Sequence, residues 1–152
     1  MTEVVIVLAV LTSGLQAGTY YTWASGVMPG LARTDDRTFV HAMQRMNVAI
    51  VNPVFLASFL GAPALGVAAA VLADGDVWAV AGAVGAVATV VITFGGNIPL
   101  NDALDAAGPV DDVPDLTAVR SAFESRWVRL NVLRALTSTA ALVLLTLAAL
   151  RV

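Results

Sequence analysis

The sequence predicts an all-α membrane protein, a four-helix bundle of transmembrane helices in a single domain. The chain has 152 residues, of which 59% are hydrophobic and only 12% are charged, and its mean hydropathy is +0.84. Soluble domains carry about 25% charged residues, so this chain lacks the ionic surface that keeps a protein in water. A chain of this length forms one domain.

Charge and cysteine content exclude several classes of protein. The net charge is −3, and every basic residue is an arginine, which argues against a nucleic-acid partner because such proteins carry a basic footprint. The absence of cysteine excludes disulfides, thiolate zinc sites, iron–sulfur clusters and cysteine nucleophiles. We therefore look for function within the membrane.

Long stretches without charge mark the first three spans. They cover residues 4–32, 46–73 and 77–101, and each exceeds the roughly 20 residues that cross a bilayer. We place the spans at about 4–24, 46–73 and 77–97. The first resembles a signal peptide in position, but an acidic residue precedes it and it is long, so we expect a mature helix.

Proline and glycine shape the second and third spans. Pro53 and Pro63 predict a kink or discontinuity near the middle of the second span. Gly82 and Gly85 predict close packing of the third against its neighbours. The short sequence from Asp74 to Asp76 predicts a tight turn that makes these two helices an antiparallel hairpin.

The fourth span, about 128–150, follows a helical segment that begins near Leu116. It reaches spanning length only with Arg129 and Arg134 near one end, where long side chains can extend toward water. No internal repeat is evident.

The longer connections, residues 24–44 and 102–126, lie on the same side of a four-helix bundle. Arginines are concentrated there: Arg33, Arg37, Arg45, Arg120, Arg126 and Arg129. Only Arg151 lies at the opposite end. The asymmetry predicts that both loops of this integral protein of the cell membrane are cytoplasmic and that both termini are outside.

Polar residues within spans indicate function, because amide and charged side chains in lipid require partners. One group lies at the start of the second span: His41, Gln44, Arg45, Asn47 and Asn52. On a helix His41 and Gln44 share a face. Tyr20 adds to this group from the cytoplasmic half of the first span.

A second group is Asn97 and Asn101, which flank Pro99. Because proline lacks an N–H and restricts the residue before it, we expect the helix to end near Asn97. Helix capping and turn chemistry are the alternative explanation for both asparagines.

A third group, Trp127, Asn131 and Arg134, forms one stripe of the last helix. The alternative for Trp127 is an interfacial aromatic belt. Arg134 requires an acceptor, because an unpaired guanidinium in a span costs roughly 2.5–3.5 kcal/mol. The candidate acceptors are Asp102, Asp105, Asn97, Asn101 or an anionic ligand.

The chemistry these groups support is narrow. One histidine without cysteine does not make a metal site, so we expect no metal, and the phosphate-binding glycine motifs are absent. A haem bound by His41 is an alternative. The groups are typical of a proton-abstraction site for an apolar, enolisable molecule, with one base, several amides, one cation and aromatic walls.

The pattern resembles the DUF1772 family of small membrane proteins, which includes anthrone oxygenases. The resemblance covers nearly the whole chain. It rests on Asn97-Ile98-Pro99-Leu100-Asn101, Trp127-x-x-x-Asn131-x-x-Arg134, Met43-Gln44-x-x-Asn47 and Asn52-Pro53.

The resemblance implies a membrane-embedded oxygenase that converts an anthrone-type aromatic polyketide to a quinone with O₂ and without a cofactor. In our hypothesis His41 is the base, the asparagines bind ketone or phenolate oxygens, Arg134 stabilises negative charge and Trp127 stacks on the rings. The candidate catalytic residues are His41, Arg134, Asn97, Asn101 and Asn131. The candidate substrate-binding residues are Gln44, Asn47, Asn52, Trp127 and Tyr20.

Two other functions stay open from the sequence. One is a haem-binding membrane oxidoreductase, and the other is a non-catalytic membrane partner or assembly subunit whose polar cluster only joins helices. The expected partners are a small apolar aromatic substrate, O₂ and the lipid bilayer, with no nucleic acid, and the chain could form a homo-oligomer.

Overall fold

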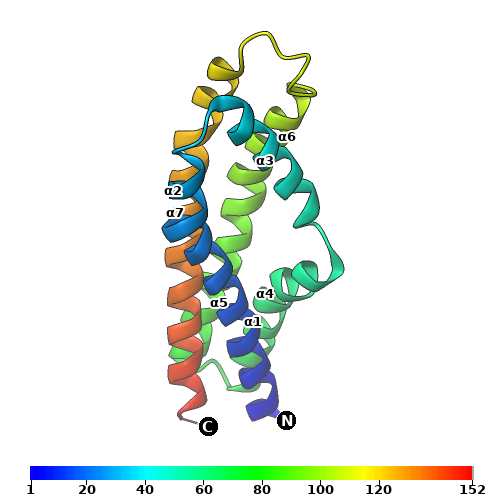
Figure 1. Ribbon diagram of the computed structural model, residues 1–152. Coiled ribbons are helices and arrows are strands. Elements are labelled where there is room, and N and C mark those ends of the chain that lie inside the picture. The colour runs from blue at the N-terminus through cyan, green and yellow to red at the C-terminus, as the bar shows by residue number, and fades with distance from the viewer. Residues whose placement is uncertain (152) are drawn as a thin grey trace.

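The computed structural model describes residues 1–151, and the secondary structure within them is helical (Figure 1). This confirms the predicted all-α membrane bundle. The elements in chain order are α1 (Thr2–Thr22), η1 (Trp23–Val27), α2 (Met28–Leu31), α3 (Asp36–Ala49), α4 (Pro53–Leu72), α5 (Val77–Ile92), η2 (Thr93–Asn97), α6 (Ile98–Ala106) and α7 (Leu116–Ala149).

Four helices are long and apolar enough to cross a membrane: Thr2–Leu31, Pro53–Leu72, Val77–Ala106 and Leu116–Ala149. The two ends of the described chain lie together at one end of the bundle, and α3 and the connection from α6 to α7 lie at the other (Figure 1). The expected placement of both long connections on one side of the bundle is therefore confirmed.

Small residues let the helices approach closely. α7 packs against α1 and α5, and α4 packs against the same two helices. A Cβ on Gly82 would lie 2.7 Å from Leu145 Cγ, and one on Gly85 would lie 3.1 Å from the Thr137 carbonyl oxygen. The close packing predicted from these glycines is present, and a side chain at either position would separate α5 from α7.

The interruption of the second span lies earlier than predicted. α3 ends at Ala49 and α4 begins at Pro53, whereas Pro63 lies inside an unbroken α4. Asn52 Oδ1 accepts a hydrogen bond of 3.0 Å from the Phe55 N–H, and proline is favourable in the first turn because its missing N–H is not needed there. The local sequence therefore begins a new helix at Pro53.

The third span does not end near Asn97, as Pro99 had suggested. It continues through the π-helical turn η2 into α6, and the Ile98 N–H donates to the Thr93 carbonyl, five residues back. The widened turn accommodates the proline, whose ring would clash with a carbonyl in a regular α-helix.

The first span contains a π-helical turn of the same kind. In η1 the Met28 N–H donates to the Trp23 carbonyl, and Pro29 follows just as Pro99 follows η2. The structure thus contains a repeat that the sequence did not reveal, because the residues of the two π-turns differ. Such turns are frequent at functional sites.

The helix α3 is held against the end of the bundle that carries the long connections. It packs on α6 and α7, with Phe39 and Met43 buried against Phe123 and Trp127 in one apolar cluster. Arg120 of α7 reinforces this packing through Asp36 Oδ1 at 3.0 Å. This packing holds α3 in place and so determines where the break between α3 and α4 lies in the bundle.

Candidate functional site

A cavity of about 280 Å³ lies between η1, the break that separates α3 from α4, η2 and α7. Its aromatic walls are formed by Tyr20, Trp23, Phe55, Phe59, Phe94 and Trp127. Its other polar lining residues are Thr19, Asn47, Thr93, Asn101 and Arg134. Aliphatic side chains in the break and at the start of α4 and α6 complete it, and we call it the aromatic pocket.

Arg134 supplies a charge to this pocket without a carboxylate partner among residues 1–151. Its side chain is buried, with 7% exposed, and its hydrogen bond runs from Nη2 to Asn131 Oδ1 at 3.0 Å. The guanidinium carbon lies 4.5 Å from the Tyr20 ring centroid and 5.2 Å from that of Trp127. An amide oxygen and two aromatic faces therefore hold the cation.

This arrangement corrects the acceptors expected for Arg134. The sequence suggested Asp102, Asp105, Asn97 or Asn101, but the protein acceptor is Asn131, three residues back on the same helix. Asn131 also donates from Nδ2 to the Tyr20 carbonyl oxygen at 3.1 Å. The amide therefore positions Arg134 and joins α7 to α1 directly before η1.

Three buried donors that belong to pocket-lining residues have no hydrogen-bond partner. They are the Tyr20 hydroxyl, Asn47 Nδ2 and Arg134 Nε. The Tyr20 hydroxyl has Arg134 and Thr93 as polar neighbours. Because buried polar groups are nearly always paired, these three donors are available to hydrogen-bond acceptors that enter the pocket.

Trp127 joins two of the predicted asparagines to the pocket wall. Its Nε1 donates to Asn101 Oδ1 at 2.8 Å, and its carbonyl oxygen accepts from Asn97 Nδ2 at 3.4 Å. Its ring lies 5.2 Å from that of Trp23. Asn101 and Trp127 line the pocket, whereas Asn97 is buried behind it with Oδ1 unpaired.

Gln44 and Asn52 lie outside the aromatic pocket and have structural partners. Gln44 Nε2 donates to the carbonyl oxygens of Leu104 and Gly108, at 3.0 Å each, and so holds α3 to the end of α6. Asn52 caps α4. Both were predicted to bind substrate; the structure gives both amides backbone partners, and Gln44 lines a separate cleft together with His41.

His41 also lies apart from the aromatic pocket. It is exposed and lines a separate cleft of about 280 Å³ that also contains Arg45, Asp105 and Asp111. The structure therefore does not bring His41 together with Arg134. The reason is that His41 and Asn47 lie six residues apart on α3 and therefore on different faces of this helix, and only the face with Asn47 lines the aromatic pocket.

The phenylalanines of the pocket were not predicted from the sequence. Phe55 stacks on Phe59 with ring centroids 5.5 Å apart, and Phe59 lies 6.1 Å from Phe94. Phenylalanine in a span is expected of any lipid-facing helix, so these residues gave no signal. The one feature of the sequence that points to them is their position: Phe55 and Phe59 follow Asn52-Pro53, and Phe94 precedes the segment from Gly95 to Pro99.

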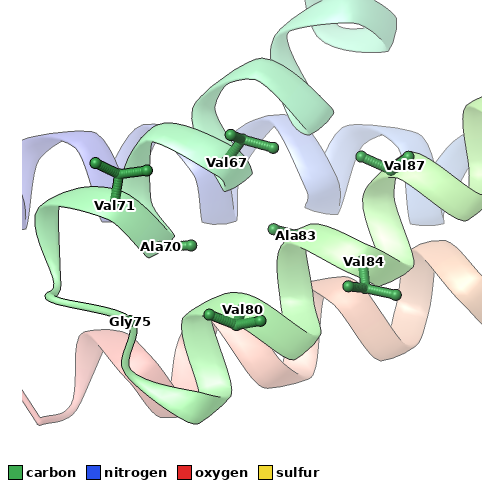
Figure 2. Close-up of a pocket in the computed structure, with 8 residues that line it drawn as sticks. All are labelled: Val67, Ala70, Val71, Gly75, Val80, Ala83, Val84 and Val87. Atoms are coloured by element: carbon green, nitrogen blue, oxygen red, sulfur yellow. The ribbon is translucent and has the colours of Figure 1, made fainter.

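A second apolar cavity has no polar chemistry. It measures about 470 Å³ and lies between α4 and α5 near the Gly75 turn, where Ala70 and Ala83 face each other across it (Figure 2). Its other lining residues are valines. A groove of this kind on a spanning helix accepts lipid chains but offers a substrate no orienting group.

The donor set of the aromatic pocket is unsuited to binding a metal ion. Within residues 1–151 no group of three or more His, Cys, Asp or Glu residues could hold one, and the lining contains no imidazole or carboxylate. The histidine considered as a haem ligand lies in the other cleft. The pocket can bind a flat aromatic molecule and stabilise negative charge on its oxygen.

Fold and site together define an integral membrane helical bundle with an aromatic, cationic pocket. The family model for anthrone oxygenase matches residues 39–144, which is more than half of the chain and includes Asn47, Asn101 and Arg134. The chain belongs to the anthrone oxygenase family, as its motifs indicated. No match was found among curated proteins or solved structures.

Proposed function

We propose that the protein oxidises an anthrone-type aromatic polyketide to the corresponding quinone with O₂, and that the reaction takes place in the aromatic pocket. The observation that carries this proposal is the buried guanidinium of Arg134, which has no carboxylate partner among the described residues and lines a pocket walled by aromatic rings. A fixed cation in such surroundings stabilises an anion more strongly than it would in water.

An anthrone suits both features of the pocket. Its fused rings are flat and apolar, and they stack on side chains such as Trp127 and Phe59. When its central methylene loses a proton, the charge moves to the carbonyl oxygen across the ring. We place this oxygen against the Nε–H of Arg134 and the hydroxyl of Tyr20, which lack partners.

The reaction then balances with O₂ alone. The methylene proton passes to water, and the resulting anion gives one electron to O₂, which yields a carbon radical and superoxide. These combine to form a C–O bond, and protonation gives a hydroperoxide. Loss of water from it, with the second hydrogen of the former methylene, forms the new carbonyl group. The sum is anthrone plus O₂ giving quinone plus water.

In this mechanism the protein accelerates the reaction by favouring the anion. The pocket lining has no imidazole or carboxylate, so the proton acceptor here is water. A role for His41 as the base is the competing hypothesis, and it requires substrate in the other cleft. The two hypotheses assign catalysis to different residues and are separable by mutation.

The test is O₂ uptake by the detergent-purified protein with a panel of anthrones, after subtraction of autoxidation. We expect uptake above background, one quinone formed for each O₂ consumed, and loss of both with the R134Q variant. Equal rates for wild type and R134Q contradict the proposal. A Soret band in the wild-type spectrum would instead favour the haem-binding oxidoreductase.

A purely structural role for the polar cluster is distinguishable by yield. If the protein is an assembly subunit, R134Q lowers the folded yield and no anthrone is consumed by wild type. If the site is catalytic, R134Q retains a folded protein and loses turnover.

We also propose that the long connections are cytoplasmic and both termini outside. The support is that Arg33, Arg37 and Arg45 lie at the same end of the bundle as the arginines at the start of α7. In intact cells, an impermeant maleimide should label the thiol of an R151C variant but not that of D111C. The reverse labelling pattern contradicts this orientation.

A further inference from the structure

The aromatic pocket has two unlike ends. Its inner end is polar and buried, with Tyr20 only 2% exposed and Arg134 7% exposed. Its outer end is apolar and open, with Val51 65% exposed and Phe94 57% exposed. A molecule that moves from the outer end to the inner end therefore passes from apolar surface to a buried cation.

The outer end lies where the second candidate membrane span, Pro53–Leu72, begins, and beside Phe94 of the third, Val77–Ala106. It is formed by segments without a charged residue, 46–73 and 77–101. Val54 and Val91, which flank the rim residues along the chain, are also largely exposed. An apolar surface of this kind on a spanning helix contacts acyl chains.

The break between α3 and α4 provides half of this rim. Residues 50–52 are outside helices, and both Ile50 and Val51 line the pocket. Asn52 holds the break in place from both sides, since its Oδ1 accepts from the Phe55 N–H and its Nδ2 donates to the Ala49 carbonyl oxygen at 3.0 Å. The other half is Phe94 of η2.

Aromatic rings connect the rim to the interior. Phe94 lies 6.1 Å from Phe59 between ring centroids, and Phe59 stacks with Phe55. All three line the pocket, as does Arg134 at its inner end. By contrast, the cleft that contains His41 is bordered by charged side chains of the loop end, such as Arg45 and Asp111.

We propose that the substrate enters the aromatic pocket sideways from the bilayer, through a portal between Val51 and Phe94. This inference rests on the proposed function for the identity of the substrate, a flat apolar aromatic molecule with a polar oxygen. Such a molecule is concentrated in the membrane because its rings partition out of water. It passes through the portal with its rings against phenylalanines and its oxygen reaches Arg134.

The chain lacks cysteine, which allows a direct test with single thiols. The V51C variant places a thiol at the portal, and V48C places one a single turn earlier on an exposed valine that lines the His41 cleft instead. Both variants carry W78F, so that the remaining tryptophans, Trp23 and Trp127, both line the pocket. Each protein is purified, reconstituted in vesicles and then labelled with a bulky maleimide, so folding precedes labelling.

The first readout is the rate at which a planar dihydroxyanthraquinone quenches tryptophan fluorescence in vesicles, which needs no turnover. We expect the label on V51C to slow quenching at least about tenfold and the label on V48C to change it less than about twofold, since only the first obstructs the portal. Slowing by the V48C label alone, equal effects of both labels, or no effect of either overturns the portal.

The second readout separates this inference from the proposed function. If the quinone quenches and the V51C label slows it, but no anthrone supports O₂ uptake, the portal stands and the proposed reaction fails. If anthrones support O₂ uptake at the same rate with and without the V51C label, the reaction stands and the portal fails.

Discussion

Arg134 donates from Nη2 to Asn131 Oδ1 at 3.0 Å, and the same amide donates from Nδ2 to the Tyr20 carbonyl oxygen at 3.1 Å. A single side chain thus orients the pocket cation and fixes the end of α1 against α7. Because an amide is neutral, it orients the guanidinium without neutralising it. The guanidinium therefore keeps its full charge, and its remaining N–H groups are available to a ligand.

Replacing Arg134 by glutamine should lower kcat by about 10²–10³, because removal of one group that stabilises a developing oxyanion has that effect. The matched control is R129Q, an exposed arginine on the same helix, which should keep wild-type turnover. Turnover is measured as O₂ uptake, and the folded yield of each variant by size-exclusion chromatography in detergent. Equal losses in the two variants would contradict a specific role for Arg134.

Tyr20 and His41 distinguish the two mechanistic hypotheses. If the reaction takes place in the aromatic pocket, Y20F should lower kcat/KM by about five- to tenfold, the equivalent of one hydrogen bond of about 1 kcal/mol, and H41A should leave it unchanged. If His41 is the base, H41A should reduce the rate far more than binding. Steady-state kinetics of both variants with one anthrone decides between them.

Gln44 should contribute to stability but not to activity. Its amide donates to two carbonyl oxygens near the end of α6, so Q44A should destabilise the protein by about 1–2 kcal/mol and lower its midpoint of thermal unfolding. Turnover at a temperature where both proteins are folded should be unchanged. Reduced turnover with unchanged stability would restore the substrate-binding role predicted from sequence.

Close packing of α5 and α7 makes Gly82 intolerant of a side chain. The added Cβ of G82A would lie 2.7 Å from Leu145 Cγ, and such overpacking costs about 1–3 kcal/mol. G95A is the control, because no atom lies within 4 Å of the added Cβ. Thermal unfolding in detergent should show a loss for G82A only, and equal midpoints would disprove the expected clash.

The contribution of the α3 N-terminus to the stability of the protein should decrease at low pH. The backbone N–H of Thr38, followed by its hydroxyl, holds the pKa of Asp35 below its ordinary value. A lowered folded-state pKa stabilises the protein above the unfolded-state pKa of about 3.9, and this contribution is lost as the pH falls through the folded value. Asparagine also caps a helix but does not titrate. The free energy of unfolding of D35N should therefore fall less than that of the wild type between pH 6 and pH 3.

Several features were predictable from the sequence because they depend on composition and spacing. The four spans follow from long apolar stretches, the hairpin from the Asp74-to-Asp76 turn, and the stripe of Trp127, Asn131 and Arg134 from helical spacing. The prolines were less informative. Pro99 stops a regular α-helix but not a π-turn, and a single chain segment does not show which of the two a bundle accommodates.

The sequence by itself determined that the protein crosses a membrane, which residues are too polar for lipid, and to which family its motifs belong. Only the tertiary structure decided which of those residues share a site. It placed His41 on the face of α3 that points away from Arg134, gave Gln44 and Asn52 backbone partners, and added phenylalanines to the pocket. The physical reason is that polarity is a property of one residue, whereas a pocket depends on how helices distant in sequence pack together.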